Sequence, residues 1–298
     1  MVSDMPKLVI GEMKNSNTIS YADDSSVHVH HKDIDSLKEG LEEICTRMIS
    51  YCQSNGLVLN SDKTQLLISP KQTCEIKVGS SLISATSEIN LLGVDFDSNF
   101  TTTPYLHNLE REANTRSALI SRLSFSMPPH VLTTLAKGLL MGKILASCPA
   151  TIPLNLNNED RTCIGVTDDI NKAIKATART ITRTKLSDKI RSEDVLKKAD
   201  LKCLNESVGS IIATTVWKSK QSMNPIGKRL FQERTIPEDC PVLRSQSSKN
   251  IRPPVPGYPN LASNIMAKVW NDIPELQSAK TLGAARTISH KWARKLPR

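Results

Sequence analysis

This chain of 298 residues has few aromatic residues, an odd number of cysteines and no long apolar stretch. Only 4% of the residues are aromatic, so the base-stacking platforms of single-strand binders are not evident. The seven cysteines form no close pairs, which argues against a disulfide framework and against a zinc knuckle. Lys137 and Lys143 interrupt the most apolar stretch, so the sequence predicts no membrane span.

The first thirty residues lack the charged-then-apolar pattern of a secretory signal. With the cysteine usage, this predicts a reduced, intracellular protein of the nucleus or cytoplasm that is not secreted. No nucleophile triad is visible. The formal net charge of +9 favours polyanionic partners. With so few aromatic residues, contacts to backbone phosphates would have to dominate, and binding would depend strongly on salt.

Two adjacent carboxylates, Asp23 and Asp24, stand in a turn-forming segment between two short alternating runs. The apolar residues of these runs are Ile19, Tyr21, Val27 and Val29. The pattern predicts a β-hairpin with the carboxylates at its tip. Two carboxylates held close together repel each other unless a divalent cation neutralises them, and Mg²⁺ prefers such oxygen ligands. The alternative is a solvated turn that binds nothing.

The segment after the hairpin predicts an amphipathic helix. Its apolar residues recur at three- and four-residue spacing: Leu37, Leu41, Ile44, Cys45, Met48, Ile49 and Cys52. Ser36 and Glu39 are spaced as a capping box, and Asn55-Gly56 is typical of a left-handed helix end. The sequence then predicts short strands at Leu57–Leu59 and Leu66–Ile68, and a further one after another turn, over Ile89–Asp97.

Three histidines, His28, His30 and His31, lie beside the predicted hairpin. Strand alternation puts His28 and His30 on one face. No cysteine or carboxylate completes a ligand set at suitable spacing, so a solvent-facing strand is favoured over a metal site.

The motifs resemble, in order and spacing, the later palm motifs of reverse transcriptases, closest to those of non-LTR, LINE-like retrotransposons of the jockey and RTE kind. They are Tyr21-Ala22-Asp23-Asp24, then Asn55-Gly56-Leu57-Val58-Leu59-Asn60 with Lys63-Thr64, then Leu92-Gly93-Val94 with Asp97. Val2–Pro6 resembles the connector before the catalytic hairpin, and Val269–Pro274, followed by Leu282 and a basic helix, resembles the tail of such proteins. The likeness is strongest over residues 1–100.

The resemblance implies RNA-templated DNA synthesis with an RNA template, a DNA primer, deoxynucleoside triphosphates and a two-metal Mg²⁺ site. Asp23 and Asp24 match the metal-binding pair, and Tyr21 matches the residue beside the primer terminus. Lys63 matches the lysine that assists pyrophosphate departure. The turn that grips the primer strand matches Leu92-Gly93. For two of these residues an ordinary structural role stays open: Lys63 as a turn lysine, and Tyr21 as a residue that fills the sheet face.

The family also uses a metal-ligand aspartate on a strand well upstream of the hairpin, with the fingers nearby. Here only twenty residues precede Tyr21, and Asp4, the sole acidic residue before Glu12, matches the connector instead. We therefore expect the isolated chain to be inactive, as a fragment of an enzyme, because positioning supplies most of phosphoryl-transfer catalysis. The alternative is a non-catalytic nucleic-acid-binding or interaction protein derived from such an element.

The densest basic stretch lies in the second half of the chain, between Asp169 and Lys198. Its first four cations fall at helical spacing opposite Ile170, Ile174, Ala178 and Ile181, and they are Lys172, Lys175, Arg179 and Arg183. This predicts one amphipathic helix whose cationic flank is either simply solvated or follows a duplex.

A pair of helices is predicted before the basic stretch, over residues 106–123 and 131–140. In the family this region is the thumb, where Arg111, Arg116 and Arg122 would face the template–primer backbone.

The predicted fold class is α+β, a partial reverse-transcriptase palm of β-hairpin, helix and short strands followed by a mostly α-helical thumb and tail. We expect the palm part at residues 1–100 and the thumb-like region at 101–242. The Ser-, Pro- and Gly-containing stretch 243–260 predicts a linker. The tail, 261–298, is expected to dock one helix on the body.

Overall fold

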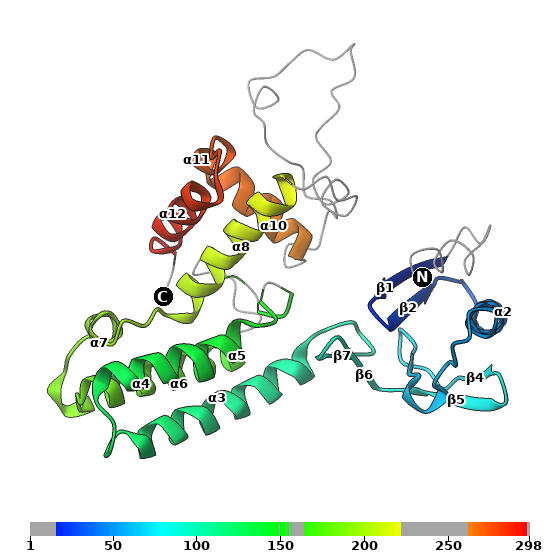
Figure 1. Cartoon of the computed structure of the whole chain (residues 1–298), viewed down its shortest axis with the longest axis horizontal. Helices are drawn as coiled ribbons and strands as arrows, with labels where there is room; N and C mark the ends of the chain where they lie inside the picture. The colour runs from blue at the N-terminus through cyan, green and yellow to red at the C-terminus, as the bar shows by residue number, and fades with distance from the viewer. Residues whose placement is uncertain are drawn as a thin grey trace, which may run out of the picture. The chain divides into compact units, whose positions relative to one another are not determined.

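Figure 1 shows a computed structural model of the chain, which describes residues 16–148, 150–152, 154, 156, 164–221 and 262–296. The predicted linker 243–260 and the connector-like Val2–Pro6 lie outside these residues. The chain divides into two compact units, Met1–Tyr105 and Leu106–Arg298. Strands occur in the first unit and helices dominate the second, so the predicted α+β class is confirmed.

The first unit begins with the predicted β-hairpin. Its strands are β1 (Ser16–Tyr21) and β2 (Asp24–Val29). Tyr21 pairs with Asp24 across the antiparallel ladder, so Ala22 and Asp23 form the turn. Thr18 pairs with Val27, so their side chains lie on the same face of the hairpin. Tyr21 is three residues after Thr18, and because successive strand residues point to alternate faces, its side chain lies on the other face. The apolar side chains of the two strands therefore lie on opposite faces of the hairpin.

The predicted helix follows as α2 (Ile34–Ser54). Asp33 caps its start by accepting a hydrogen bond from the Ser36 backbone N–H at 2.7 Å. The predicted capping box at Ser36 and Glu39 is wrong, because the helix begins three residues earlier than that box requires. The cap stabilises the ionised carboxylate, since the hydrogen bonds from Ser36 lower the pKa of Asp33.

The end of α2 is the predicted left-handed cap. Asn55 is the last half-helical residue, and Gly56 adopts a φ of +68°. The Leu57 N–H donates to the Cys52 carbonyl at 2.8 Å and the Gly56 N–H to the Gln53 carbonyl at 3.2 Å. These two bonds are those of a Schellman motif, and they turn the chain sharply away from the helix axis.

Two further small sheets lie in the described part of the first unit, residues 16–105. The three-stranded sheet has the order β3-β5-β4 and contains β3 (Leu66–Leu67), β4 (Glu75–Val78) and β5 (Ser81–Thr86). The second sheet is an antiparallel hairpin of β6 (Glu88–Leu91) and β7 (Val94–Asp97). β3 runs parallel to β5, and β4 runs antiparallel to it.

The predicted strand at Leu57–Leu59 is wrong. These residues leave the helix cap with no paired strand beside them, and Val58 remains 94% exposed. A short 3₁₀ turn, η1 (Ser61–Lys63), follows instead. The predicted strand over Ile89–Asp97 is two strands joined by a turn, because Leu92 and Gly93 reverse the chain.

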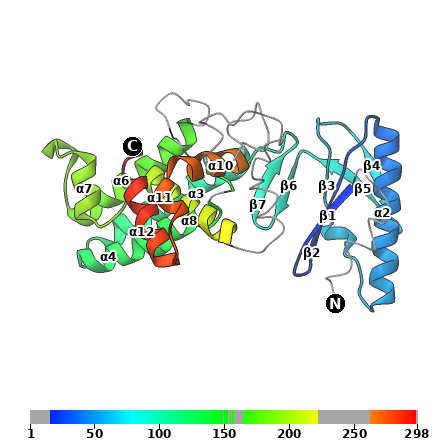
Figure 2. The same cartoon turned by 90° about the horizontal axis from the view of Figure 1, so that it is seen from above.

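Helix α2 packs against both the hairpin and the three-stranded sheet, and it lies along one edge of the first unit in Figure 2. On one side Ile44 and Met48 contact Val27 and Val29 of the hairpin. On the other side a cluster of sheet residues covers it: Leu66, Ile68, Ile76 and Val78. The hairpin is thus fixed through β2, and its other face remains outside this core.

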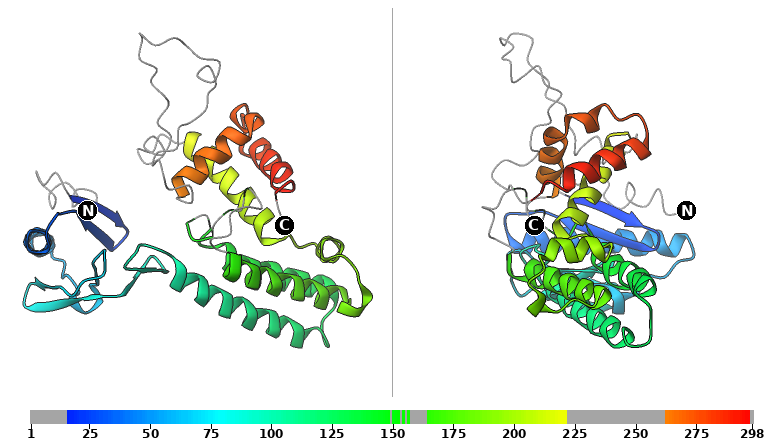
Figure 3. Two further views of the ribbon diagram at one scale, coloured as in Figure 1. Left: turned by 180° about the vertical axis from the view of Figure 1, so that it is seen from behind. Right: turned by 90° about the vertical axis from the view of Figure 1, so that its left-hand side faces the viewer.

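The second unit starts with three helical segments that lie side by side in Figures 1 and 3. They are α3 (Thr103–Leu123), then the continuous run of α4 (Pro129–Leu135), the π-helical segment η2 (Ala136–Met141) and α5 (Gly142–Leu145), and finally α6 (Ile164–Thr182). Both helices of the predicted pair are therefore confirmed. The buried face is apolar and includes Leu109, Ile120, Leu132, Leu140, Ile170 and Ile174.

Helix α6 ends one residue before Arg183, which takes a left-handed φ of 54°. A 3₁₀ turn, η3 (Leu186–Asp188), and α7 (Ser192–Lys198) follow. The prediction that Arg183 continues the cationic flank of the helix is therefore wrong. The backbone turns here because Thr184, Ser187 and Asp188 favour turns over helix interiors.

The described residues of the tail, 262–296, form three helices, where docking of one was expected. They are α10 (Ala262–Asp272), α11 (Pro274–Gln277) and α12 (Leu282–Ala293). α10 and α12 pack against α8 (Leu204–Gln221), and α11 lies between them. Trp217 of α8 donates its indole N–H to the Ala279 carbonyl at 3.0 Å. In the described part of the chain, no helix combines the length and apolarity needed to cross a membrane.

Candidate metal and nucleic-acid contacts

The tip of the first hairpin presents Tyr21, Asp23 and Asp24 to solvent. Tyr21 is 68% exposed, and Asp23 and Asp24 are also exposed. Asp24 lies directly opposite Tyr21, so the two side chains share the face that does not pack on α2. Among the described residues neither carboxylate has a hydrogen-bonding or ionic partner, so both are open to a ligand.

The backbone of this tip is constrained. Ala22 has a φ of 53°, which a non-glycine residue adopts at a cost of about 1–2 kcal/mol. Just behind the turn, the hydroxyls of Ser20 and Ser25 hydrogen-bond at 3.0 Å across the strands. A strained residue persists where the surrounding structure fixes it, and such residues cluster at functional sites. The two-residue turn itself requires a positive φ at its first residue, as at Leu92, so the strain at Ala22 follows from the hairpin that carries the two carboxylates.

Asp23 and Asp24 suit magnesium by ligand type, because Mg²⁺ takes oxygen ligands and is often held by one or two carboxylates together with substrate phosphates. Within the described ranges, no three or more His, Cys, Asp or Glu residues gather as a cation site. These two residues thus supply part of a ligand set, and phosphate or other oxygens have to supply the rest.

Lys63 ends the 3₁₀ turn η1 and is exposed. The Asn60 side chain accepts hydrogen bonds from the backbone N–H groups of Asp62 at 3.1 Å and of Lys63 at 3.3 Å. The turn is tied to β5 through the Ser61 and Ser81 hydroxyls at 3.2 Å. The backbone at Lys63 is therefore that of an ordinary Asx turn, and its ammonium makes no ion pair within the described residues.

Leu92 and Gly93 form the tight turn between β6 and β7. Both have positive φ, 51° and 81°, as a two-residue hairpin with the twist of its strands requires. A Cβ on Gly93 would meet no atom within 4 Å, so the glycine serves the backbone conformation and not a close approach. Asn90 accepts a hydrogen bond from the Gly93 N–H at 3.0 Å, and Leu92 is 57% exposed.

Asp97, the last residue of the palm-motif resemblance, hydrogen-bonds within the chain. Its carboxylate accepts hydrogen bonds from the Asn99 N–H at 2.9 Å, the Thr101 N–H at 2.8 Å and the Thr101 hydroxyl at 2.6 Å. Burial raises the pKa of this carboxyl, but the hydrogen bonds from Thr101 and Asn99 outweigh it, so the pKa lies below its usual value. Asp97 therefore stabilises the end of β7.

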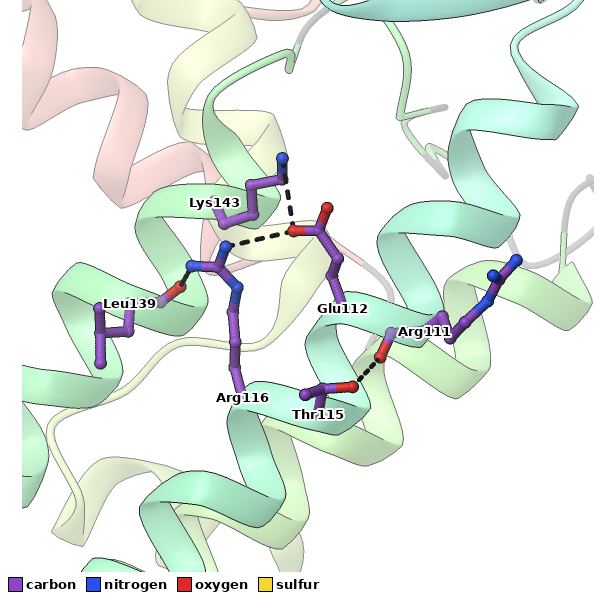
Figure 4. A network of polar contacts seen from close by, with 6 residues as sticks. All are labelled: Arg111, Glu112, Thr115, Arg116, Leu139 and Lys143. Atoms are coloured by element: carbon purple, nitrogen blue, oxygen red, sulfur yellow. Dashed lines mark hydrogen bonds and ion pairs between the residues drawn. The ribbon is translucent and has the colours of Figure 1, made fainter.

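Arg116, which the resemblance assigns to the template–primer backbone, also has partners within the chain (Figure 4). Its guanidinium donates to the Leu139 carbonyl in the π-helical segment at 2.7 Å and to the Glu112 carboxylate at 3.2 Å. Lys143 lies 3.3 Å from the same Glu112 oxygen. A π-helical turn changes the hydrogen-bond spacing of the backbone, and here Arg116 binds one of its carbonyls. Arg116 is therefore a structural link between α3 and η2.

Arg111, five residues earlier on α3, behaves differently. It is exposed, and its guanidinium donates only to the neighbouring Asn108 side chain, at 3.1 Å, among the contacts that the structure records for it. Lys172 on α6 pairs with Asp169 at 2.6 Å, and this hydrogen bond raises the pKa of Lys172. Arg111 is thus free to reach a phosphate, whereas Lys172 is partly neutralised.

Arg179 is the second predicted contact with an internal role. Its guanidinium donates to the Lys185 carbonyl at 3.3 Å and to the Ile190 carbonyl at 3.2 Å, both in the segment after α6. Lys175 is partly buried on α6, and Arg183 is exposed just beyond its end. The predicted cationic flank is thus divided between residues that hold the fold and residues that face solvent.

The sequence did not predict a folded loop in the exposed segment that Arg179 supports, because Arg183 was placed at helical spacing with the three cations before it. The turn formers Ser187 and Asp188 were the available signal. His28 and His30, by contrast, are exposed as the strand pattern predicts.

The comparisons with known proteins leave the family of the chain undetermined. No protein-family model, no curated protein and no solved structure matches it.

Proposed function

We propose that the chain is the later palm and the thumb of an RNA-directed DNA polymerase of the non-LTR retrotransposon kind. The observation that carries the proposal is the hairpin tip. Two exposed carboxylates without internal partners stand on a strained turn, Tyr21 lies beside Asp24, and the hairpin is fixed through β2 to α2. The resemblance of the motifs that follow, up to Leu92-Gly93, adds to this observation.

In this proposal the predicted site residues of the first unit have different roles. Asp23 and Asp24 hold Mg²⁺ together with the phosphates of the incoming deoxynucleoside triphosphate. When bound, magnesium stabilises the charge on the attacking and leaving oxygens of the phosphoryl transfer. Tyr21 supports the primer terminus, and Leu92-Gly93 contacts the primer strand. Lys63, whose ammonium is exposed, assists the departure of pyrophosphate.

In the second unit, the predicted contacts with nucleic acid are sorted by whether each cation already has partners within the chain. Arg111, Lys175 and Arg183 remain available for the sugar–phosphate backbone of the RNA template and DNA primer. Arg116 and Arg179 stay predicted contacts, but their guanidinium groups also donate to carbonyls of the chain itself.

The second candidate is a non-catalytic nucleic-acid-binding protein derived from such an element. The exposed cations after α6 favour it, since they support binding without any chemistry. The two candidates differ in what the carboxylates do. In the binding protein, the loss of Asp23 changes nothing, whereas in the polymerase it removes synthesis.

The deciding experiment is primer extension on an RNA template with magnesium. We compare the 298-residue chain with the same chain joined to an upstream segment that supplies fingers and a further strand-borne aspartate. Extension is expected only from the joined form, because Asp23 and Asp24 alone give an incomplete ligand set.

In the joined form, Asp23→Asn is expected to lower extension by at least about 100-fold while it leaves template binding unchanged, because it removes metal affinity and no phosphate contact. Asp62→Asn is the matched control on an exposed turn of the same unit, and it is expected to retain full extension. Undiminished extension by Asp23→Asn would contradict the metal assignment.

A further inference from the structure

The segment between α6 and α7, residues 183–191, is held in a defined shape by its own hydrogen bonds; we call it the α6–α7 loop. Arg179 binds the carbonyls of Lys185 and Ile190, which stand at two separate points of the loop. The Lys185 N–H donates to the Asp188 carboxylate at 2.7 Å, and the Lys189 N–H donates to the Leu186 carbonyl at 3.3 Å. The loop is thus a folded projection of the second unit.

The backbone of the loop takes unusual conformations at both ends. Arg183 has a φ of 54° and Lys189 a φ of 52°, although neither is glycine. Left-handed residues of this kind persist only where surrounding contacts impose them, and they concentrate at ligand contacts. The bonds from Arg179 are the contacts that impose the shape here.

The surface of the loop is strongly cationic. Its four exposed cations are Arg183, Lys185, Lys189 and Arg191. Asp188 is the single acidic residue, and the Lys185 N–H already engages its carboxylate. None of the four cations forms an ion pair within the described part of the chain, so their charge is available to an anionic partner.

At the start of the 3₁₀ turn, Leu186 is 81% exposed between these cations. Ile190 adds a second apolar side chain that is 39% exposed. An exposed leucine next to Lys185, in a loop with three further cations, resembles the apolar wedges that proteins place against base steps from the minor groove. A membrane surface fits poorly, because interfacial binding needs a wide apolar face, which two residues do not provide.

We propose that the α6–α7 loop binds a nucleic-acid duplex, with its four cations on backbone phosphates and Leu186 against the minor groove. This inference rests on the proposed function for the identity of the duplex, an RNA–DNA hybrid. Arg179 is its positioning residue, because it acts on the duplex only through the shape of the loop.

The test measures binding of the full chain to a fluorescent RNA–DNA hybrid by anisotropy, between about 50 and 200 mM salt. One variant removes three charges of the loop: Lys185→Gln, Lys189→Gln and Arg191→Gln. The matched control removes three exposed lysines of the tail helices and their connections: Lys268→Gln, Lys280→Gln and Lys291→Gln.

The loop variant is expected to bind at least about tenfold more weakly at low salt. The slope of log K against log salt should fall by about 2 to 3, since each lost phosphate contact removes about 0.7–0.9. The control variant should keep most of the slope. Leu186→Ser is expected to weaken binding severalfold without a change in slope, because the leucine carries no charge.

The outcomes separate the inference from the proposed function. Absence of hybrid binding by the unmodified chain at low salt would overturn the proposed function and the inference with it. Tight binding by the unmodified chain with equal losses in the loop and control variants would overturn the inference alone. Vesicles of phosphatidylcholine and phosphatidylserine serve as the rival probe. Vesicle binding that is lost in the loop variant, together with unchanged hybrid binding, would also overturn the inference.

Discussion

Some of the charged residues predicted to contact a ligand have partners within the chain and others have none, and the two units supply an example of each. In the first unit, Asp23, Asp24 and Lys63 are exposed, and their side chains have no partners among the described residues. In the second unit, Arg116 and Arg179 bind backbone carbonyls of their own chain. The residue types alone suggest ligand contacts in both units. The difference teaches that a cation at helical spacing has to be checked against the carbonyls within its reach before it is assigned to a polyanion.

The arginines can take this internal role because a guanidinium presents several donors in a fixed plane. Arg116 reaches a carbonyl of the π-helical segment and the Glu112 carboxylate at once. A carboxylate can only accept hydrogen bonds, and no donor among the described residues reaches Asp23 or Asp24. Asp23 and Asp24 therefore remain open, whereas Arg116 and Arg179 do not.

The largest effect on stability is expected from Arg116→Met. Loss of the guanidinium leaves the Leu139 carbonyl without its donor and Glu112 with Lys143 alone, at a cost of about 1.5–3 kcal/mol. Arg111→Met is the matched control on the same helix and should change stability by no more than about 0.5 kcal/mol. Urea denaturation of both variants measures the difference. Equal stabilities would remove the contrast between the internal and the outward arginines.

A smaller effect of opposite sign is expected at the hairpin tip. Ala22→Gly relieves the left-handed φ of 53° and should stabilise the chain by up to about 1 kcal/mol. Ala85→Gly, within β5, is the control and should destabilise by about 0.5–1 kcal/mol, because glycine weakens a strand. If Ala22→Gly destabilises as much as Ala85→Gly does in thermal or urea unfolding, the turn is not strained.

The smallest expected effect concerns pH and the docking of α12 on α8. His290 of α12 lies 3.0 Å from the Lys202 ammonium; Glu206, Arg286 and Arg294 are the other charged groups that act on it. Burial lowers the pKa of His290, and the Lys202 charge lowers it further. The unfolded chain then binds a proton at higher pH than the folded chain does.

The contribution of His290 to stability is therefore present above the ordinary histidine pKa of 6.5 and is lost as the pH falls below it. Thermal unfolding on both sides of that pH checks the direction. His290→Gln should flatten this part of the pH dependence. A steeper fall in the variant would mean that the histidine is protonated in the folded chain.

The helices were predictable from the sequence because they depend on local periodicity and on caps. Gly56 marked the end of α2, and the apolar spacing marked α3 and α6. The first hairpin followed in the same way from its alternation and its turn. Strands β4 and β5 were missed although Glu75–Val78 alternates, and Leu57–Leu59 was assigned to a strand that has no partner.

The internal partners of the two arginines could not be predicted from local sequence patterns. Arg116 finds its carbonyl 23 residues away along the chain, in a π-helical segment that no spacing rule indicated. Arg179 has partners within the chain because the backbone reverses at Arg183, which has a left-handed φ although it is not glycine. This reversal brings the carbonyls of Lys185 and Ile190 within reach of its guanidinium. In both cases the fold of a distant or following segment decides which cations are left for a ligand.

The most direct test of the open carboxylates is a titration with Mn²⁺, in place of Mg²⁺, followed by paramagnetic broadening of backbone amide signals. We expect broadening centred on residues 21–24 in the unmodified chain and its loss in Asp23→Asn, because the two carboxylates supply the oxygen ligands. Broadening centred elsewhere, or broadening at the tip that persists in Asp23→Asn, would contradict the metal-binding role of this hairpin.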